Sequence, residues 1–173
     1  MLLNLMKVLN EPDSSLTVND TIDLSSLVVE EGIESFPSGA KVSIVLKNIM
    51  DCITLSLKCE FEYVSECARC LELVTQNLSF DFESIVKVDE NAEVILDADA
   101  VVIDSSNQLD VDELVIGLVL MNLPMRVLCK DDCAGLCPKC GKNLNEGECD
   151  CEKKEVDPRL LKLKELLDDN KLS

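Results

Sequence analysis

Residues 129–151 read CKDDCAGLCPKCGKNLNEGECDC and hold six of the ten cysteines of the chain. Within this stretch, the core Cys-Pro-Lys-Cys-Gly at 137–141 is typical of a zinc knuckle, in which a tight turn brings two thiolates to one ion. Pro138 stiffens this turn, and Gly141 can adopt a positive φ directly after the second ligand. The turn residues at 143–147 would then bring a second pair of sulfur atoms back to the same ion.

The remaining cysteines include a second Cys-x-x-Cys pair, Cys67 and Cys70. Cys59 lies on the apolar face of a predicted strand, so we interpret it as a small core residue, and we set Cys52 aside with it. Eight thiols are left, enough for two four-sulfur sites. One predicted site consists of Cys137, Cys140, Cys149 and Cys151. The other joins Cys67 and Cys70 to Cys129 and Cys133. The alternative is a single site, with the other thiols free.

The expected compartment favours metal over disulfides. Residues 1–7 have neither the basic start nor the cleavage site of a secretory signal, and no apolar run approaches the roughly 18 residues of a membrane span. A cytoplasmic chain keeps its thiols reduced, so a disulfide cluster is the weaker interpretation. Histidine is absent, which excludes a Cys/His catalytic pair and a mixed Cys/His site. We therefore expect closed, structural Zn2+ centres. Iron could use the same ligands, but the knuckle favours zinc or a single iron.

Most of the negative charge lies in the first three quarters of the chain. The net charge is −18, and residues 1–128 carry 7 basic against 23 acidic residues, a net charge of −16. Such a body repels nucleic acid phosphates and attracts basic proteins, of which ribosomal proteins are an abundant class. The alternative is that the acidic surface serves only solubility.

The body itself has the pattern of an α+β fold with an antiparallel sheet. Apolar and polar residues alternate strictly over 53–63, and a second alternating run follows over 77–88, which together predict a long hairpin with one buried face. Cys67 and Cys70 lie where this hairpin reverses. Asp110 is placed to cap a helix that is apolar nearly all round and that ends before Pro124, so we predict one helix buried against the sheet.

These patterns predict three segments. They are an acidic α+β body (1–128), a zinc-ribbon-like, metal-binding segment (129–151), and a linker followed by a C-terminal helix (152–173). Asp157 and Pro158 would start that helix, and Leu160, Leu163 and Leu167 would line one of its faces.

The cysteine motifs together resemble a known family. The run from Cys129 to Asn145, closing on Cys149-Asp150-Cys151, and the upstream Cys67-Ala68-Arg69-Cys70-Leu71-Glu72 are similar to the YceD family of large ribosomal RNA subunit accumulation proteins. This resemblance implies a role in the synthesis, processing or stability of 23S rRNA. The genes of the family commonly neighbour one for a large-subunit ribosomal protein. No catalytic residues are established for the family, so none is carried over.

The leading hypothesis is a non-enzymatic ribosome-biogenesis factor. Its acidic body would bind a basic large-subunit ribosomal protein or a pre-ribosomal particle, and its contact with rRNA would be indirect. The alternative, from another class, is a thiol-based redox or metal-sensing regulator that uses Cys67 and Cys70. Direct RNA binding by lysines of the tail is a third option, which the scarcity of aromatic residues for base stacking disfavours.

Overall fold

A computed structural model describes residues 1–25, 27, 32–50, 52–88, 95–97, 100–103 and 106–151. The chain divides into two compact units, Met1–Cys133 and Ala134–Ser173, each considered by itself. The boundary falls after Cys133, so that the two predicted sulfur sites belong to different units. The predicted C-terminal helix lies outside the described residues, and the division into three segments stays a prediction.

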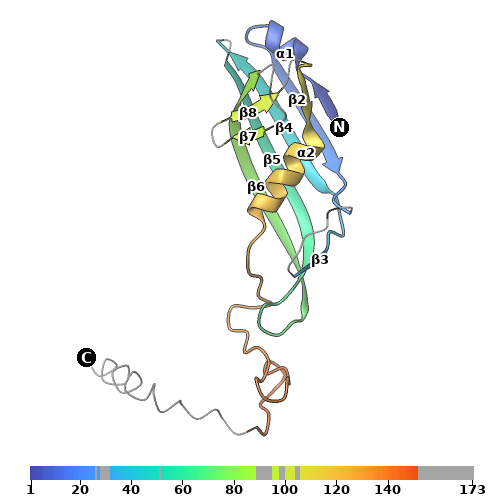
Figure 1. Cartoon of the computed structure of the whole chain (residues 1–173), viewed down its shortest axis with the longest axis vertical. Coiled ribbons are helices and arrows are strands. Elements are labelled where there is room, and N and C mark those ends of the chain that lie inside the picture. The colour runs from blue at the N-terminus through green and yellow to red at the C-terminus, as the bar shows by residue number, and fades with distance from the viewer. Residues whose placement is uncertain are drawn as a thin grey trace, which may run out of the picture. The chain divides into compact units, whose positions relative to one another are not determined.

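The first unit contains every named helix and strand. In chain order they are β1 (Leu2–Asn4), α1 (Met6–Asn10), β2 (Ser15–Ile22), β3 (Ile33–Ser35), β4 (Ala40–Ile49), β5 (Cys52–Glu66), β6 (Leu73–Val88), β7 (Ile95–Asp97), β8 (Ala100–Ile103), β9 (Gln108–Asp110) and α2 (Val111–Asn122). Strands β1 and β9 pair by themselves, and a seven-stranded sheet has the order β2-β4-β5-β6-β8-β7, with β3 on β5. In Figure 1 the two longest strands, β5 and β6, form a hairpin that runs through this unit.

The α+β prediction is confirmed, with one difference in the sheet. Strands β5 and β6 pair antiparallel without a register shift from Ile53↔Val86 to Glu66↔Leu73, as the alternating residues predicted. However, β8 joins β6 in parallel, so the sheet is mixed. A parallel neighbour requires a crossover between the two strands, and the period-two pattern of one strand carries no information about its direction.

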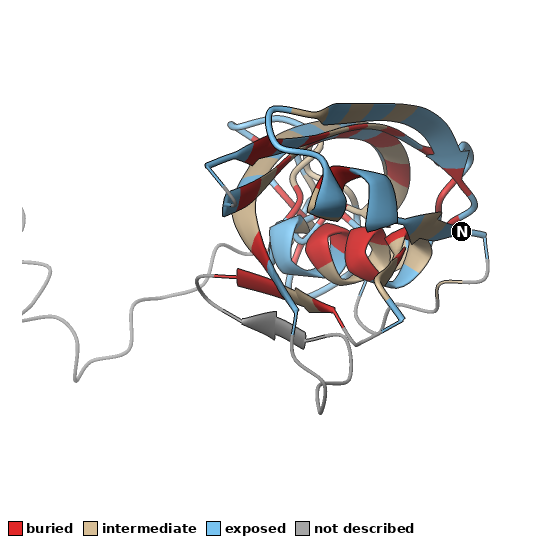
Figure 2. Cartoon of the chain, turned by 90° about the horizontal axis from the view of Figure 1, so that it is seen from above, coloured by how far each residue is buried: buried red, intermediate tan, exposed pale blue. Residues whose placement is uncertain are grey.

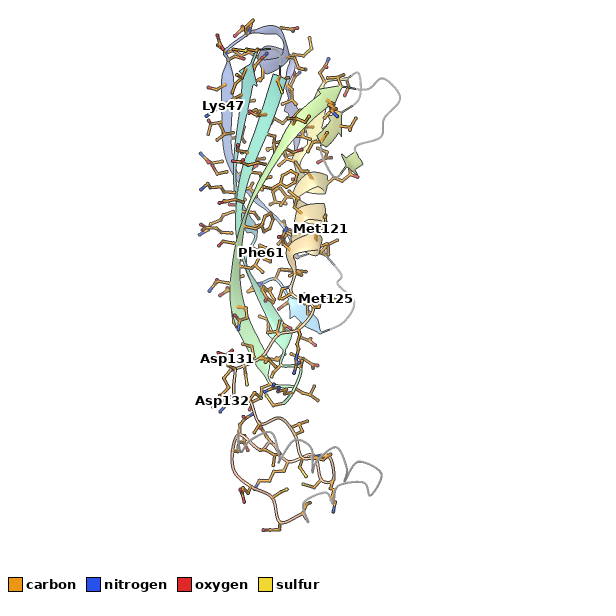
Figure 3. The ribbon with its side chains drawn as sticks, turned by 90° about the vertical axis from the view of Figure 1, so that its left-hand side faces the viewer. Lys47, Phe61, Met121, Met125, Asp131 and Asp132 are labelled. Atoms are coloured by element: carbon orange, nitrogen blue, oxygen red, sulfur yellow. The ribbon has the colours of Figure 1, made fainter. Side chains whose placement is uncertain are left out.

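The core lies between the sheet and α2. Alternate residues of β4 and β5 are buried, and the sheet curves around the helix, so that the buried positions face inwards (Figure 2). Cys59 is fully buried in this core, as predicted. The outer face of the sheet carries polar side chains such as Lys47, which projects away from α2 (Figure 3).

Helix α2 begins where the sequence predicted. The Asp110 carboxylate accepts hydrogen bonds from the backbone N–H groups of Asp112 and Glu113. Five residues of the helix are buried, namely Val111, Leu114, Val115, Leu118 and Val119. The predicted burial of this helix is confirmed on one of its sides, whereas Leu120 is 44% and Met121 74% exposed. The sheet covers only one side of the helix. Among the described residues, no helix has the length and apolarity needed to cross a membrane.

Candidate metal centres

The tip of the β5–β6 hairpin forms a compact thiol loop. The backbone N–H of Leu71 donates to the carbonyl oxygen of Cys67 at 2.9 Å, and the N–H of Cys67 donates to the carbonyl oxygen of Glu72 at 2.8 Å. Leu71 has a positive φ of 61°. These two bonds close the loop around Cys67 and Cys70, so both sulfur atoms project from one tight turn.

The second unit contains the same loop in a different sequence. The N–H of Gly141 donates to the carbonyl oxygen of Cys137 at 2.9 Å, and the N–H of Cys137 donates to that of Lys142 at 2.8 Å. Gly141 has a φ of 75°, so it occupies the position of Leu71 in the first loop. Two Cys-x-x-Cys pairs that differ in sequence therefore have one backbone geometry. This agrees with the knuckle predicted at 137–141 and extends it to the hairpin tip.

Residues Leu71 and Gly141 provide a matched test of this geometry. A left-handed conformation costs a residue with a side chain about 1–2 kcal/mol, and Leu71 recovers little by packing because it is 58% exposed. We expect Leu71→Gly to leave the free energy of unfolding unchanged or to raise it. Gly141→Leu should weaken its loop by about 1–2 kcal/mol, although a Cβ there meets nothing within 4 Å. Thermal unfolding of the metal-loaded chain would measure the first effect, and competition for metal the second. Equal losses in both variants would contradict the assignment.

The first four-sulfur group, called here the body cluster, consists of Cys67, Cys70, Cys129 and Cys133. Its sulfur atoms all lie within 4.8 Å of one another. The Sγ atoms of Cys67 and Cys133 are 3.8 Å apart, and those of Cys70 and Cys129 are 3.6 Å apart. Four sulfurs at about 2.3 Å from one Zn2+ stand about 3.8 Å apart at the corners of a tetrahedron. The spacing fits one tetrahedral ion and is too long for a disulfide.

Backbone contacts hold the segment after α2 against the hairpin tip. The N–H of Ala68 donates to the carbonyl oxygen of Val127 at 2.9 Å, and the N–H of Cys129 donates to Sγ of Cys67 at 3.3 Å. Arg69 adds a clamp, since its Nη1 donates to the carbonyl oxygens of Cys133 at 2.8 Å and Asp131 at 3.3 Å. Asp131 and Asp132 lie at this end of the sheet in Figure 3. Sequence reasoning missed Arg69, because its acceptors are main-chain atoms far along the chain.

The second group, called here the distal cluster, consists of Cys137, Cys140, Cys149 and Cys151. Its sulfur atoms also lie within 4.8 Å of one another. An isolated bridge between Leu136 and Asn143 supports the knuckle, and the N–H of Leu144 donates to the carbonyl oxygen of Gly135 at 2.8 Å. The Asn145 side chain accepts from the N–H of Ala134 at 2.9 Å. These bonds form the return turn that the sequence assigned to residues 143–147.

Each cluster contains one thiol whose environment favours the thiolate. Burial opposes ionisation of Cys67, but hydrogen bonds from the N–H groups of Arg69, Cys70 and Cys129 lower its pKa to about 6. Hydrogen bonds from the N–H groups of Cys140 and Lys139 lower the pKa of Cys137 to about 6. The neighbouring thiol of Cys140, together with burial, raises the pKa of Cys151 to about 12. Several thiolates held this close together repel one another, and a bound divalent cation relieves that repulsion. The sulfur atoms of each cluster therefore suit a metal ion that binds four thiolates.

The two cysteines outside the clusters differ from each other. Cys59 is buried in the core, where burial raises its pKa to about 11. Cys52 is exposed at the start of β5. The structure thus brings together the eight predicted residues in the two predicted groups. Four soft thiolates per group are compatible with zinc, while the identity of the metal is a proposal.

Comparisons with known proteins agree with the cysteine motifs. The profile of the family described as large ribosomal RNA subunit accumulation protein YceD matches residues 55–167. An uncharacterized protein of Mycobacterium tuberculosis is 26% identical over 172 residues, which cover 96% of this chain and 81% of that protein. An Arabidopsis thaliana protein, described as large ribosomal RNA subunit accumulation protein YCED homolog 1, chloroplastic, is 36% identical over 50 residues, 29% of this chain and 16% of that protein. No solved structure matches.

Proposed function

The chain belongs to the YceD family of large ribosomal RNA subunit accumulation proteins, and we propose that it is a non-enzymatic factor of ribosome biogenesis. In this proposal it supports the accumulation of 23S rRNA by binding a basic large-subunit ribosomal protein, alone or on a precursor particle. Its contact with rRNA is indirect. The two clusters bind structural Zn2+ and take no part in chemistry on a substrate.

The observation that carries the proposal is the family match together with the charge of the body. Residues 1–128 have a net charge of −16, from 7 basic and 23 acidic residues. An acidic surface attracts basic proteins and repels RNA phosphates at the same time. Ribosomal proteins are basic, so a factor of this charge can hold one before it meets rRNA.

The test is sedimentation of ribosomal particles at two salt concentrations. We expect the tagged chain to co-sediment with large-subunit precursors at about 50 mM salt and to be released at about 500 mM, because salt screens attraction between exposed charges. Cells without the protein should accumulate less 23S rRNA relative to 16S rRNA. A chain that stays at the top of the gradient at low salt, in cells with unchanged 23S rRNA, would overturn the proposal.

The alternative regulator is distinguished by counting thiols. Cys67 and Cys70 are only 0% and 5% exposed, and they stand beside Cys129 and Cys133, whereas a redox sensor needs an accessible pair. With both clusters loaded, we expect two metal ions per chain and one fast-reacting thiol, Cys52, which disappears in Cys52→Ser. Elemental analysis and titration with a thiol reagent measure both quantities. One ion per chain, with a rapidly and reversibly oxidised Cys67–Cys70 pair, would support the regulator instead.

A further inference from the structure

Strand β6 has one long side without a described neighbour. Its 16 residues pair with β5 from Leu73 to Val86, but on the other side only Ile85–Val88 pair, with β8. Within the part of the chain that the structure describes, residues 73–84 therefore form an edge, which we call the β6 edge (Figure 1). Such an edge presents a row of unpaired backbone N–H and C=O groups, on which another strand can pair.

The β6 edge lacks most of the features by which proteins block such pairing, although it carries the charged residues Asp81 and Glu83. Natural edges are often short or bulged, or carry proline or charged residues, lysine above all. Residues 73–84 read LVTQNLSFDFES, without lysine, arginine or proline. Their register with β5 is uninterrupted. The edge is thus long, regular and open, which is the form that β-strand addition requires.

Next to these backbone groups lies a row of partly exposed apolar side chains. Leu78, Phe80 and Phe82 point to the inner face and are only partly buried. The residues of β5 directly opposite them are Phe61, Cys59 and Leu57, which are 4%, 0% and 1% exposed. Strand β5 has neighbouring strands on both sides, whereas no described strand lies beside residues 73–84 of β6 on the side away from β5. An added strand would cover the row with every second side chain.

The outer side of the same edge is acidic. Asp81 and Glu83 are exposed on the outer face, and residues 73–84 contain no cation. Nζ of Lys58 lies 3.8 Å from Oδ1 of Asp81, and the two side chains are 75% and 69% exposed. An ion pair this exposed to solvent contributes little. The outward side chains of an added strand would therefore meet the carboxylate of Glu83 and the weakly paired carboxylate of Asp81, which favour lysine or arginine.

We propose that the β6 edge binds an extended basic segment of a partner protein as an additional strand. Apolar residues of that segment cover Leu78, Phe80 and Phe82, and the alternating lysine or arginine residues face Asp81 and Glu83. This inference rests on the proposed function, for which it names the surface that holds the basic partner. A second copy of the chain is the weaker occupant, because pairing two edges would bring the acidic side chains of both copies together.

The first experiment uses three peptides and the full, metal-loaded chain. A ten-residue peptide of alternating valine and lysine is the probe. One control replaces lysine by glutamate, and the other carries N-methyl groups on alternate backbone nitrogens. We expect the probe to shift and protect the backbone amides of residues 73–84 in NMR spectra, with at least tenfold weaker binding of both controls. Equal binding of all three peptides, or shifts confined to another surface, would overturn the proposal.

Matched charge variants localise the contact. We expect Asp81→Lys/Glu83→Lys to weaken probe binding about tenfold. Asp20→Lys/Glu34→Lys makes the same change in net charge on β2 and β3 and should change binding less than twofold. Phe80→Ala should also weaken binding about tenfold. Equal losses in the two charge variants would show attraction to net charge alone and refute an edge site. Sedimentation equilibrium of the free chain should show a monomer. A dimer with protected residues 73–84 would identify self-pairing and overturn the basic partner.

A second arm separates this inference from the function on which it rests. The wild type and Asp81→Lys/Glu83→Lys are compared in the particle gradients described above, where the variant should lose co-sedimentation. If both chains co-sediment equally, the β6 edge is refuted as the docking surface while the ribosomal role stands. If the wild type stays out of the particles although the probe binds at residues 73–84, the ribosomal role is refuted and the edge stands as a peptide site.

Discussion

Removal of the metal is expected to unfold residues 134–151 while the seven-stranded sheet stays folded. Among residues 134–151, the described part of this unit, only Gly135 and Cys137 are buried, so this segment has no apolar core of its own to stabilise it. Chains this short fold with the help of a metal or disulfides. Structural zinc provides an apparent 10–16 kcal/mol of binding free energy, which is then folding free energy for the segment.

Amide hydrogen exchange measures this result residue by residue. The backbone N–H groups of Cys137, Gly141 and Leu144 donate the hydrogen bonds that close the loops of the distal cluster. After treatment with a chelator, these groups should exchange at unprotected rates. The amides in the centre of β5, between β4 and β6, should remain protected. Cys137→Ser should reproduce the effect of the chelator on the distal cluster alone. Protection of the distal amides that survives verified loss of metal would contradict a structural role for the ion.

The body cluster should respond more mildly to the same treatment. Its ligands also belong to backbone structure that needs no ion, since β5 and β6 pair up to Glu66 and Leu73. Without the ion, the Arg69 guanidinium would still donate hydrogen bonds to the carbonyl oxygens of Asp131 and Cys133, in the segment that follows α2. We expect faster exchange at Ala68 and Cys133 with the sheet intact. The predicted boundary between the body and the metal-binding segment would then fall at Cys133. The body cluster would stabilise one unit, and the distal cluster would form the other.

The sequence predicted the parts of the fold that rest on local periodicity. Strict alternation over 53–63 located β5 and its buried face, because a half-buried strand must alternate. Asp110 located the start of α2, because a helix N-terminus needs an acceptor for its free N–H groups. The grouping of the eight thiols followed from the number of ligands that each ion requires and from the placement of Cys67 and Cys70 at a chain reversal.

The features that sequence reasoning missed depend on contacts between distant segments. The parallel pairing of β8 with β6 follows from a crossover, which leaves no mark in either strand. Leu71 has a left-handed backbone conformation, and the sequence places a glycine at the equivalent position only in the other loop, at Gly141. The β6 edge was invisible for the same reason, because LVTQNLSFDFES has the composition of a strand and does not show that the pairing with β8 begins only at Ala100, beside Ile85.

Phe61→Ala is expected to cost the body about 3–5 kcal/mol, a large part of the stability of a typical domain. Phe61 is 4% exposed, and its ring centroid lies 6.1 Å from those of Phe36 and Tyr63 and 6.4 Å from that of Phe80. Truncation would remove three ring contacts and leave a cavity between the sheet and α2. Urea unfolding should show a lower midpoint with an unchanged slope, which reports lost stability without a change in the surface exposed.

Phe80→Ala is the matched control, because it removes the same ring from the neighbouring strand on the same face. Phe80 is partly exposed, and among the described rings it lies close to that of Phe61 alone. Phe80→Ala should therefore lower the free energy of unfolding by less than half as much as Phe61→Ala, by about 1–2 kcal/mol. Equal costs would mean that the row on β6 is as well packed as the core and has no surface left for a partner. A small cost with weakened peptide binding would show that Phe80 contributes more to recognition than to folding.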